Sequence, residues 1–150
     1  MSNKEKKRLV TMLAACAVAL CAAPGHANDN GAPRRECSVA MLRGLYLFKG
    51  SGFNLTASGA TVPKAIIESI RFNGDGTLVA ETATVTVLGA PPNRSQGSLG
   101  TYTVLPDCTG TITFSNGPAF DTFVSSPLLL SLIQTAGPGV LQGDARFVSR

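Results

Sequence analysis

Hydrophobic and polar residues alternate with a period of two over much of the chain after residue 36. The stretch Gly100–Phe114, GTYTVLPDCTGTITF, is typical, because two alternating segments flank a turn that contains Cys108. Such alternation puts apolar side chains on one face of a β-strand and polar side chains on the other. No long stretch keeps the period of an amphipathic helix, so the pattern predicts an all-β protein.

The pattern predicts eight strands, separated by turns rich in Gly, Pro, Asn and Asp. We place them at Gly44–Ser51, Ala65–Asn73, Thr77–Leu88, Ser98–Val104, Thr109–Ser115, Ala119–Ser125, Leu128–Thr135 and Val140–Val148. Most connections are short, which favours antiparallel neighbours; the two longer loops are Gly52–Lys64 and Gly89–Gly97. Ser38–Leu45 is compatible with one or two helical turns before the first strand.

A sheet of short antiparallel strands either closes on itself or folds into a sandwich. Closure removes the edge strands, and we therefore predict a single antiparallel up-and-down β-barrel of about eight strands with a short N-terminal lead-in. The run Leu128–Ile133 is apolar on both faces. It predicts either a strand whose outer face is covered by another segment or a contact between copies.

The first 27 residues have the composition of a secretory signal peptide. A basic segment precedes the apolar stretch Leu9–Ala23, which is too short to span a bilayer comfortably, and Gly25 and Ala27 predict cleavage after Ala27. The alternative is a lipoprotein box at Leu13–Cys16, which would anchor the chain through a lipid on Cys16. Either signal predicts export, to the periplasm or the outside of the cell.

The mature chain then starts with a polar, flexible tail at 28–36 and continues as one β-domain over 37–150. The signal segment takes with it four of the 13 basic residues and one of the nine acidic residues, which leaves a net charge near +1. No basic stripe remains, so we expect no nucleic-acid partner. We also expect no membrane-spanning segment in the mature chain; its oligomeric state stays open.

Two cysteines, Cys37 and Cys108, remain after cleavage. An even number of cysteines in an exported chain predicts a disulfide between them rather than a free thiol. Asp107 beside Cys108 would raise the pKa of a free thiol there and make it less reactive. We therefore interpret Cys108 as half of a structural disulfide.

Histidine is absent from the mature chain, because His26 lies in the signal segment. This excludes Ser–His–Asp and Cys–His catalysis as well as histidine-ligated metals within residues 28–150. Two cysteines cannot complete a four-thiolate zinc site, and no glycine-rich phosphate loop is present. We predict no catalytic residue, no metal site and no cofactor.

Two carboxylates, Glu68 and Glu81, stay as candidate cavity residues, depending on the register of the hairpin around Asn73–Thr77. A two-residue turn would place Glu68 opposite Glu81 in an apolar setting, where the pair would share a proton or bind a cation. A three-residue loop with Gly76 in the left-handed conformation shifts the register by one residue. Glu81 would then oppose Ser69, diagonal to Arg71. The sequence NGDGT favours this second register.

Three segments together resemble a known family: CSVAMLRGLYLFKGSGF, IRFNGDGTL and GSLGTYTVLPDCTGTITF. In this order they are similar to small exported bacterial proteins of unassigned activity that are built as lipocalin-like, or calycin-like, β-barrels. The Gly44-x-Tyr46 element is similar to the Gly-x-Trp of lipocalins, with Tyr in place of Trp. The resemblance covers residues 37–150 and implies a barrel with an internal cavity.

We expect a non-enzymatic barrel that binds a small apolar ligand or a partner protein, because eight-stranded barrels hold one small ligand or are filled by side chains. The first alternative is a surface-displayed structural or interaction module with a filled barrel. A second alternative is an enzyme of the cyclase or isomerase type, which would use Glu68 or Glu81 together with a tyrosine as acid and base.

Overall fold

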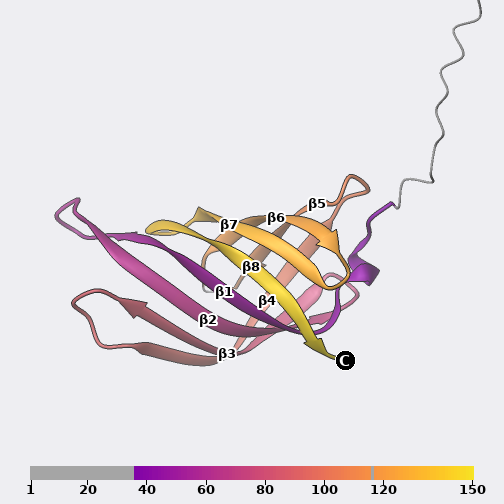
Figure 1. The fold of residues 1–150 in the computed structure, drawn as a ribbon, viewed down its shortest axis with the longest axis horizontal. Coiled ribbons are helices and arrows are strands. Elements are labelled where there is room, and N and C mark those ends of the chain that lie inside the picture. Colours follow the sequence, from indigo (N-terminus) through magenta and orange to yellow (C-terminus); the bar gives the residue numbers. More distant parts are fainter. Residues whose placement is uncertain (1–35, 116) are drawn as a thin grey trace, which may run out of the picture. The chain divides into compact units, whose positions relative to one another are not determined.

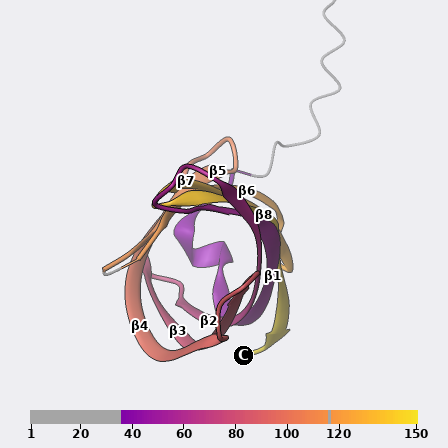
Figure 2. The same cartoon turned by 90° about the vertical axis from the view of Figure 1, so that its left-hand side faces the viewer.

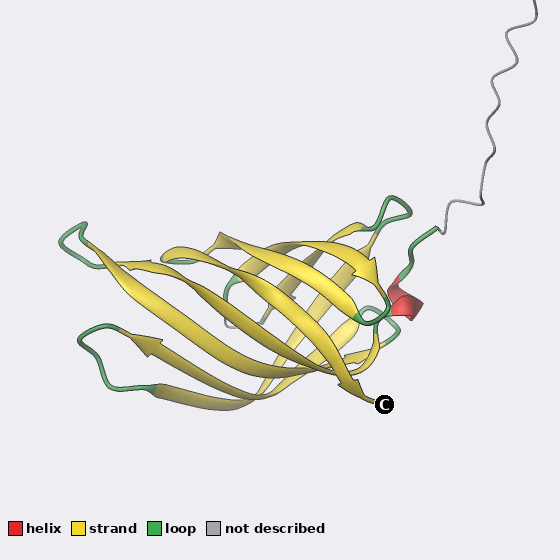
Figure 3. Ribbon diagram, in the orientation of Figure 1, coloured by secondary structure: helices red, strands yellow, loops and turns green. Residues whose placement is uncertain are grey.

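The computed structural model describes residues 36–115 and 117–150. They form a closed barrel of antiparallel strands in which each strand pairs with its neighbours in sequence and β8 pairs with β1 (Figures 1 and 3). The strands are β1 (Arg43–Leu55), β2 (Thr61–Asn73), β3 (Thr77–Val87), β4 (Asn93–Val104), β5 (Thr109–Phe114), β6 (Ala119–Ser126), β7 (Leu129–Ala136) and β8 (Gly139–Ser149). The predicted fold class, an up-and-down β-barrel of eight strands, is confirmed.

Alternation along each strand builds the core inside the barrel. In β5, Gly110, Ile112 and Phe114 are buried, and the three threonines with which they alternate are exposed. The largest fully buried side chains are Tyr46, Phe48, Phe72, Leu42, Ile70, Leu78, Ile112, Leu130 and Leu141. Burial of each such side chain stabilises the fold by roughly 1.5–3 kcal/mol, so the packed interior carries most of the stability.

Glycines let β1 and β8 approach each other closely. Gly50 and Gly143 are direct cross-strand partners on these two strands. A Cβ atom at Gly143 would collide with the backbone of Lys49 and with the Cα of Gly50. Any larger residue at 143 would therefore force the two strands apart, which is why glycine is needed at this position of the barrel wall.

The two ends of the barrel differ in construction. The turns after β2, β4 and β6 lie at one end, together with the C-terminal end of β8 and the short 3₁₀ turn η1 (Val39–Met41). At the other end β1–β4, with 11 to 13 residues each, extend beyond β5–β7, with six to eight. Figure 2 looks into the barrel from the side of these long strands, with η1 across the opposite end. We call the η1 side the closed end and the opposite side the open end.

Hydrogen bonds from Tyr102 hold η1 in place at the closed end. Its hydroxyl lies 2.9 Å from the carbonyl oxygen of Val39 and 3.0 Å from that of Leu42, and donates its hydrogen to them. The same hydroxyl accepts a hydrogen bond from the backbone N–H of Gly74, in the β2–β3 turn. Leu42 is completely buried. One side chain from β4 thus ties the lead-in to a neighbouring turn.

A disulfide between Cys37 and Cys108 fixes the same segment a second time. It joins the residues before η1 to the β4–β5 turn across 71 positions of sequence. The N–H of Cys37 also donates to the carbonyl oxygen of Pro106. The predicted pairing is confirmed, and a disulfide of this kind is consistent with an oxidising compartment.

The β2–β3 and β4–β5 turns are built alike. In both, an aspartate (Asp75 or Asp107) accepts hydrogen bonds from the N–H and hydroxyl of the threonine two residues later, an Asx-type turn. These hydrogen bonds hold the pKa of both aspartates below the usual range. The residue between is left-handed in each turn: Gly76 has φ 93° and Cys108 has φ 72°. The disulfide therefore occupies a position that favours glycine.

The structure corrects the bounds of the two longer loops. The loops placed at Gly52–Lys64 and Gly89–Gly97 are shorter, because strand pairing continues through Pro63 on β2 and through the first residues of β4. Phe123 is 51% exposed, because Thr122 and Val124 take the inward positions of β6. The helical segment expected within Ser38–Leu45 is the single turn η1.

The apolar run Leu128–Ile133 has two faces, as the sequence predicts. Leu130 and Leu132 are buried, and Leu128 and Ile133 are exposed, with no described segment over them.

The predicted signal peptide and almost all of the 28–36 tail lie outside the described residues. Within the described part of the chain, no helix is long and apolar enough to cross a membrane.

Candidate functional site

The β2–β3 hairpin decides how the two candidate carboxylates lie. Its loop has the three residues Gly74–Gly76, and the strands beside it pair in the register that the sequence favours. Glu68 has Ala83 as its partner on β3 and Phe48 on β1. The alternative register, in which Glu68 faces Glu81, is therefore wrong.

A β-bulge in β3 changes the register beyond the turn. The regular pairing ends with Ile70 and Ala80, and the next pair is Ser69 and Thr82. Glu81 is therefore an extra residue, and Glu81 and Thr82 together oppose the single residue Ser69. The sequence predicts the opposition of Glu81 and Ser69 but not the bulge that adds Thr82 to it.

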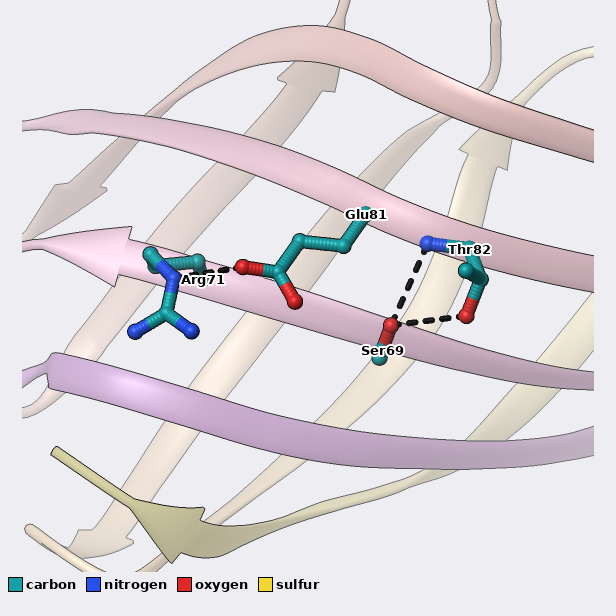
Figure 4. A network of polar contacts seen from close by, with 4 residues as sticks. All are labelled: Ser69, Arg71, Glu81 and Thr82. Atoms are coloured by element: carbon teal, nitrogen blue, oxygen red, sulfur yellow. Dashed lines mark hydrogen bonds and ion pairs between the residues drawn. The ribbon is translucent and has the colours of Figure 1, made fainter.

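Figure 4 shows the contacts that hold this bulge on the outer face of the barrel. The Arg71 Nε donates to the Glu81 carboxylate, as their predicted diagonal position suggests, and both side chains are partly exposed. Ser69 Oγ accepts a hydrogen bond from the N–H of Thr82 and contacts its hydroxyl at 2.8 Å. Glu81 thus belongs to a surface network and not to the barrel interior.

The bulge also decides which side chains of β3 face inward. Without the extra residue, the threonines at 82, 84 and 86 would follow Ala80 into the barrel. With it, Ala83 and Val85 take the inward positions, and Thr82 is exposed. One inserted residue therefore makes the wall beside Glu68 apolar.

A cleft of about 600 Å³ opens at the end where β2–β4 extend beyond β5. Its walls come from β2, β3 and β4 on one side and from the β5–β6 connection, Phe120 and Leu141 on the other. Its apolar lining consists of Ile66, Ala83, Val85, Leu99, Phe114, Pro118, Phe120 and Leu141. Its polar side chains are Lys64, Glu68, Asn93, Ser95, Gln96, Ser98 and Ser115.

The β4 side of this cleft is an unpaired strand edge. β4 pairs with β3 as far as Asn93, but its pairing with β5 begins only at Gly100. Most backbone polar groups between these two residues therefore have a partner on one side alone; the carbonyl of Leu99 accepts from the N–H of Ser115. The unpaired edge offers additional donors and acceptors to a molecule in the cleft.

Glu68 lies at the inner limit of the cleft and is only 8% exposed. Its neighbours on β2 with the same inward orientation are Ile66 and Ile70. No described residue donates a hydrogen bond to its carboxyl group. Burial raises the pKa of Glu68 from its ordinary 4.5 to about 7, because the charged form loses its hydration. The sequence already makes Glu68 a candidate, although through the register that places it opposite Glu81.

Lys64 is the other charged residue that lines the cleft among the described residues. It lies four positions before Glu68 on the same face of β2, about 13 Å away at the usual rise of a strand. Partial burial lowers the pKa of its amine. The cleft thus carries a carboxyl group at its base and an amine nearer the mouth, and they do not form an ion pair.

The two tyrosines do not complete an acid–base pair with Glu68. The Tyr46 hydroxyl donates to the carbonyl oxygen of Pro127 at the closed end, and Tyr102 holds η1 there. Burial raises the pKa of Tyr46 to about 12, with a smaller effect from Tyr102, and burial likewise raises the pKa of Tyr102. Neither side chain lines the cleft.

Sequence reasoning missed Gln134 on β7, which is 7% exposed. Its Nε2 donates to the carbonyl oxygen of Ala136, but its Oε1 is buried without a hydrogen-bond partner among the described residues. Its cross-strand partner is Phe120, a cleft residue. The signal was present in the sequence, because Gln134 continues the inward series of Leu130 and Leu132.

Within residues 36–115 and 117–150, no group of three or more His, Cys, Asp or Glu side chains could hold a metal ion.

The chain matches no family model, and no curated protein matches it in sequence. Its fold is similar to that of a de novo designed fluorescence-activating β-barrel, with 12% identity and a TM-score of 0.45. That alignment covers 73% of this chain and 96% of the designed chain, a likeness too distant to carry functional information.

Proposed function

We propose that the protein is an exported, non-enzymatic barrel that binds a small amphipathic molecule in the cleft at its open end. The observation that carries this proposal is the cleft itself, with about 600 Å³ and a mixed lining. Binding sites for small molecules have this size, a largely apolar wall and a few convergent polar groups. The closed end supports the proposal too, since a fixed end leaves one mouth for entry.

Export is supported by the Cys37–Cys108 disulfide, by the signal-like composition of the first 27 residues and by the resemblance to small exported bacterial barrels. A binding role is favoured over catalysis because the two tyrosines lie outside the cleft. Glu68 therefore lacks the partner that the isomerase alternative requires.

Titration with N-phenyl-1-naphthylamine, an uncharged dye that fluoresces in apolar surroundings, tests the proposal. We expect saturable binding of one dye per chain. Val85→Phe fills the cleft and should weaken binding by roughly tenfold or more, because the dye and the new ring compete for one space. Thr84→Phe puts the same ring outside the cleft, one residue away on β3, and should leave binding unchanged. Absent binding, or equal loss in both variants, would contradict the proposal.

An interaction module is the second candidate, favoured by an apolar patch on the outer surface. Phe53 on β1 lies between its cross-strand partners Pro63 on β2 and Val140 on β8, and all three are exposed. Such a patch suits a protein partner. Phe53→Ser should then abolish any association seen by sedimentation, with dye binding unaffected.

A further inference from the structure

We propose that the molecule bound in the cleft carries a primary ammonium group, which pairs with the carboxylate of Glu68. This inference rests on the proposed function and names the class of its ligand. It starts from the surroundings of Glu68: the cross-strand partners Phe48 and Ala83 and the inward neighbours Ile66 and Ile70 are all apolar.

Glu68 can gain a hydrogen-bonding or ionic partner from one direction, the cleft. Glu68 is 8% exposed and lines the cleft, and its carboxyl group accepts no hydrogen bond from any described residue. Lys64 is too far along β2 to pair with it. A cation that neutralises Glu68 must therefore arrive through the cleft, as part of the bound molecule.

An ammonium group fits this position better than a metal ion or a neutral group. A metal ion needs several ligands, and a single carboxylate among apolar side chains does not supply them. An ammonium pairs with one carboxylate through short, charge-assisted hydrogen bonds, which are about twice as strong as neutral ones. It also removes the cost of a buried, unpaired charge.

The apolar part of the lining defines the body of the ligand. Ile66, Val85, Phe114, Phe120 and Leu141 form the walls beyond the carboxylate, so an apolar body lies against them. Lys64 repels a second cation nearer the mouth. The expected ligand is thus a monoamine with an apolar body, bound with its ammonium group inward.

Competition against N-phenyl-1-naphthylamine with octylamine, octanol and octanoate tests the inference. The three molecules share one apolar chain and differ only in the head group. At pH 8 we expect octylamine to bind the wild-type protein roughly tenfold or more tightly than octanol. Its advantage should shrink at pH 5, because Glu68 is then protonated, while octanol binding stays constant.

Glu68→Gln should remove most of the octylamine advantage and leave octanol binding within about twofold. Glu81→Gln is the matched control, since it makes the same change on the outer face. It should alter neither the octylamine affinity nor the octanol affinity. If the dye and octanol do not bind, the proposed function fails. The inference fails if the dye and octanol bind but octylamine binds no more tightly than octanol. It also fails if octanoate binds most tightly of the three, or if Glu68→Gln leaves the affinity for octylamine unchanged. The pH comparison on wild-type protein decides the question even if Glu68→Gln does not fold.

Discussion

At the closed end of the barrel, the hydroxyl of Tyr102 is satisfied by Val39, Leu42 and Gly74, whereas at the open end the carboxyl of Glu68 has no donor. The single buried side-chain atom without a hydrogen-bond partner among the described residues, Oε1 of Gln134, also belongs to the open half. Both ends are made from strands of the same sheet. The difference teaches that paired polar groups fix one end of this fold, whereas unpaired polar groups lie at the end where we propose that a ligand binds.

The largest expected effect on stability comes from removing the disulfide at the closed end. Replacing Cys37 by Ala and Cys108 by Gly should lower the free energy of unfolding by about 4 kcal/mol, because the bond closes a loop across 71 positions. Urea denaturation measures the change. Dye binding at the open end should persist under native conditions. Loss of binding in a protein that is still folded would show that the two ends are not independent.

A control separates the bond from the backbone conformation of the turn. With Ala at both positions, the protein should be about 1 kcal/mol less stable than with Gly at 108, because residue 108 is left-handed. Equal stability of the two variants would mean that the turn rearranges once the disulfide is gone.

The second test is the pH dependence that Glu68 imposes. Its pKa is about 7 in the folded protein and 4.5 ordinarily, so the folded state holds a proton that the unfolded chain releases as the pH rises between these values. The free energy of unfolding should therefore fall across this window, by about 3 kcal/mol in total. The full stability is present below pH 4.5 and the loss is complete above pH 7.

Glu68→Gln should abolish this slope and be the more stable protein at pH 8, measured by urea denaturation from pH 4.5 to 8. Glu81→Gln should keep the slope of the wild type, because Glu81 lies on the surface. If the free energy of unfolding depends on pH in the same way in the wild type and in Glu68→Gln, then Glu68 is not the buried, unpaired carboxyl group described here.

Tyr102→Phe is the third test and acts on the closed end. It removes the hydrogen bonds of the Tyr102 hydroxyl with the Gly74 N–H and with the carbonyl oxygens of Val39 and Leu42, and should cost about 2 kcal/mol. Amide hydrogen exchange should speed up selectively at Gly74 and around η1. Tyr46→Phe, which loses a single hydrogen bond to Pro127, should cost about 1 kcal/mol. A uniform increase in exchange would argue against a local role for Tyr102.

Local rules predict the closed end better than the open end. The turn with Gly76 and the pairing of Cys37 with Cys108 follow from chemistry within a few residues or from a cysteine count. The open end depends on strands that continue through Gly52 and Pro63, residues that local rules treat as breaks. Barrel closure outweighs those local preferences, and it depends on pairing between distant strands, which no short window of sequence shows.

The bulge at Glu81 has a signal in the sequence, which is a change of phase within one strand. Leu78 and Ala80 are apolar at even positions, whereas Ala83 and Val85 are apolar at odd positions of the same strand. A change of phase inside one strand requires an extra residue if both halves face the core. Glu68 is a candidate from the alternation of β2 alone, whereas its apolar neighbour Ala83 follows only once the bulge is included.

The smallest expected effect comes from Glu81→Gln, which completes the comparison between two carboxylates of one hairpin. The Arg71–Glu81 pair is partly exposed, so its loss should cost less than about 1 kcal/mol, and the cost should shrink further in 1 M salt. Urea denaturation at low and high salt measures this. The bulge itself should survive, since the Ser69–Thr82 hydrogen bonds and the inward phase of Ala83 remain. A cost as large as that of Tyr102→Phe would mean that the ion pair sets the register, and through it the apolar wall of the cleft.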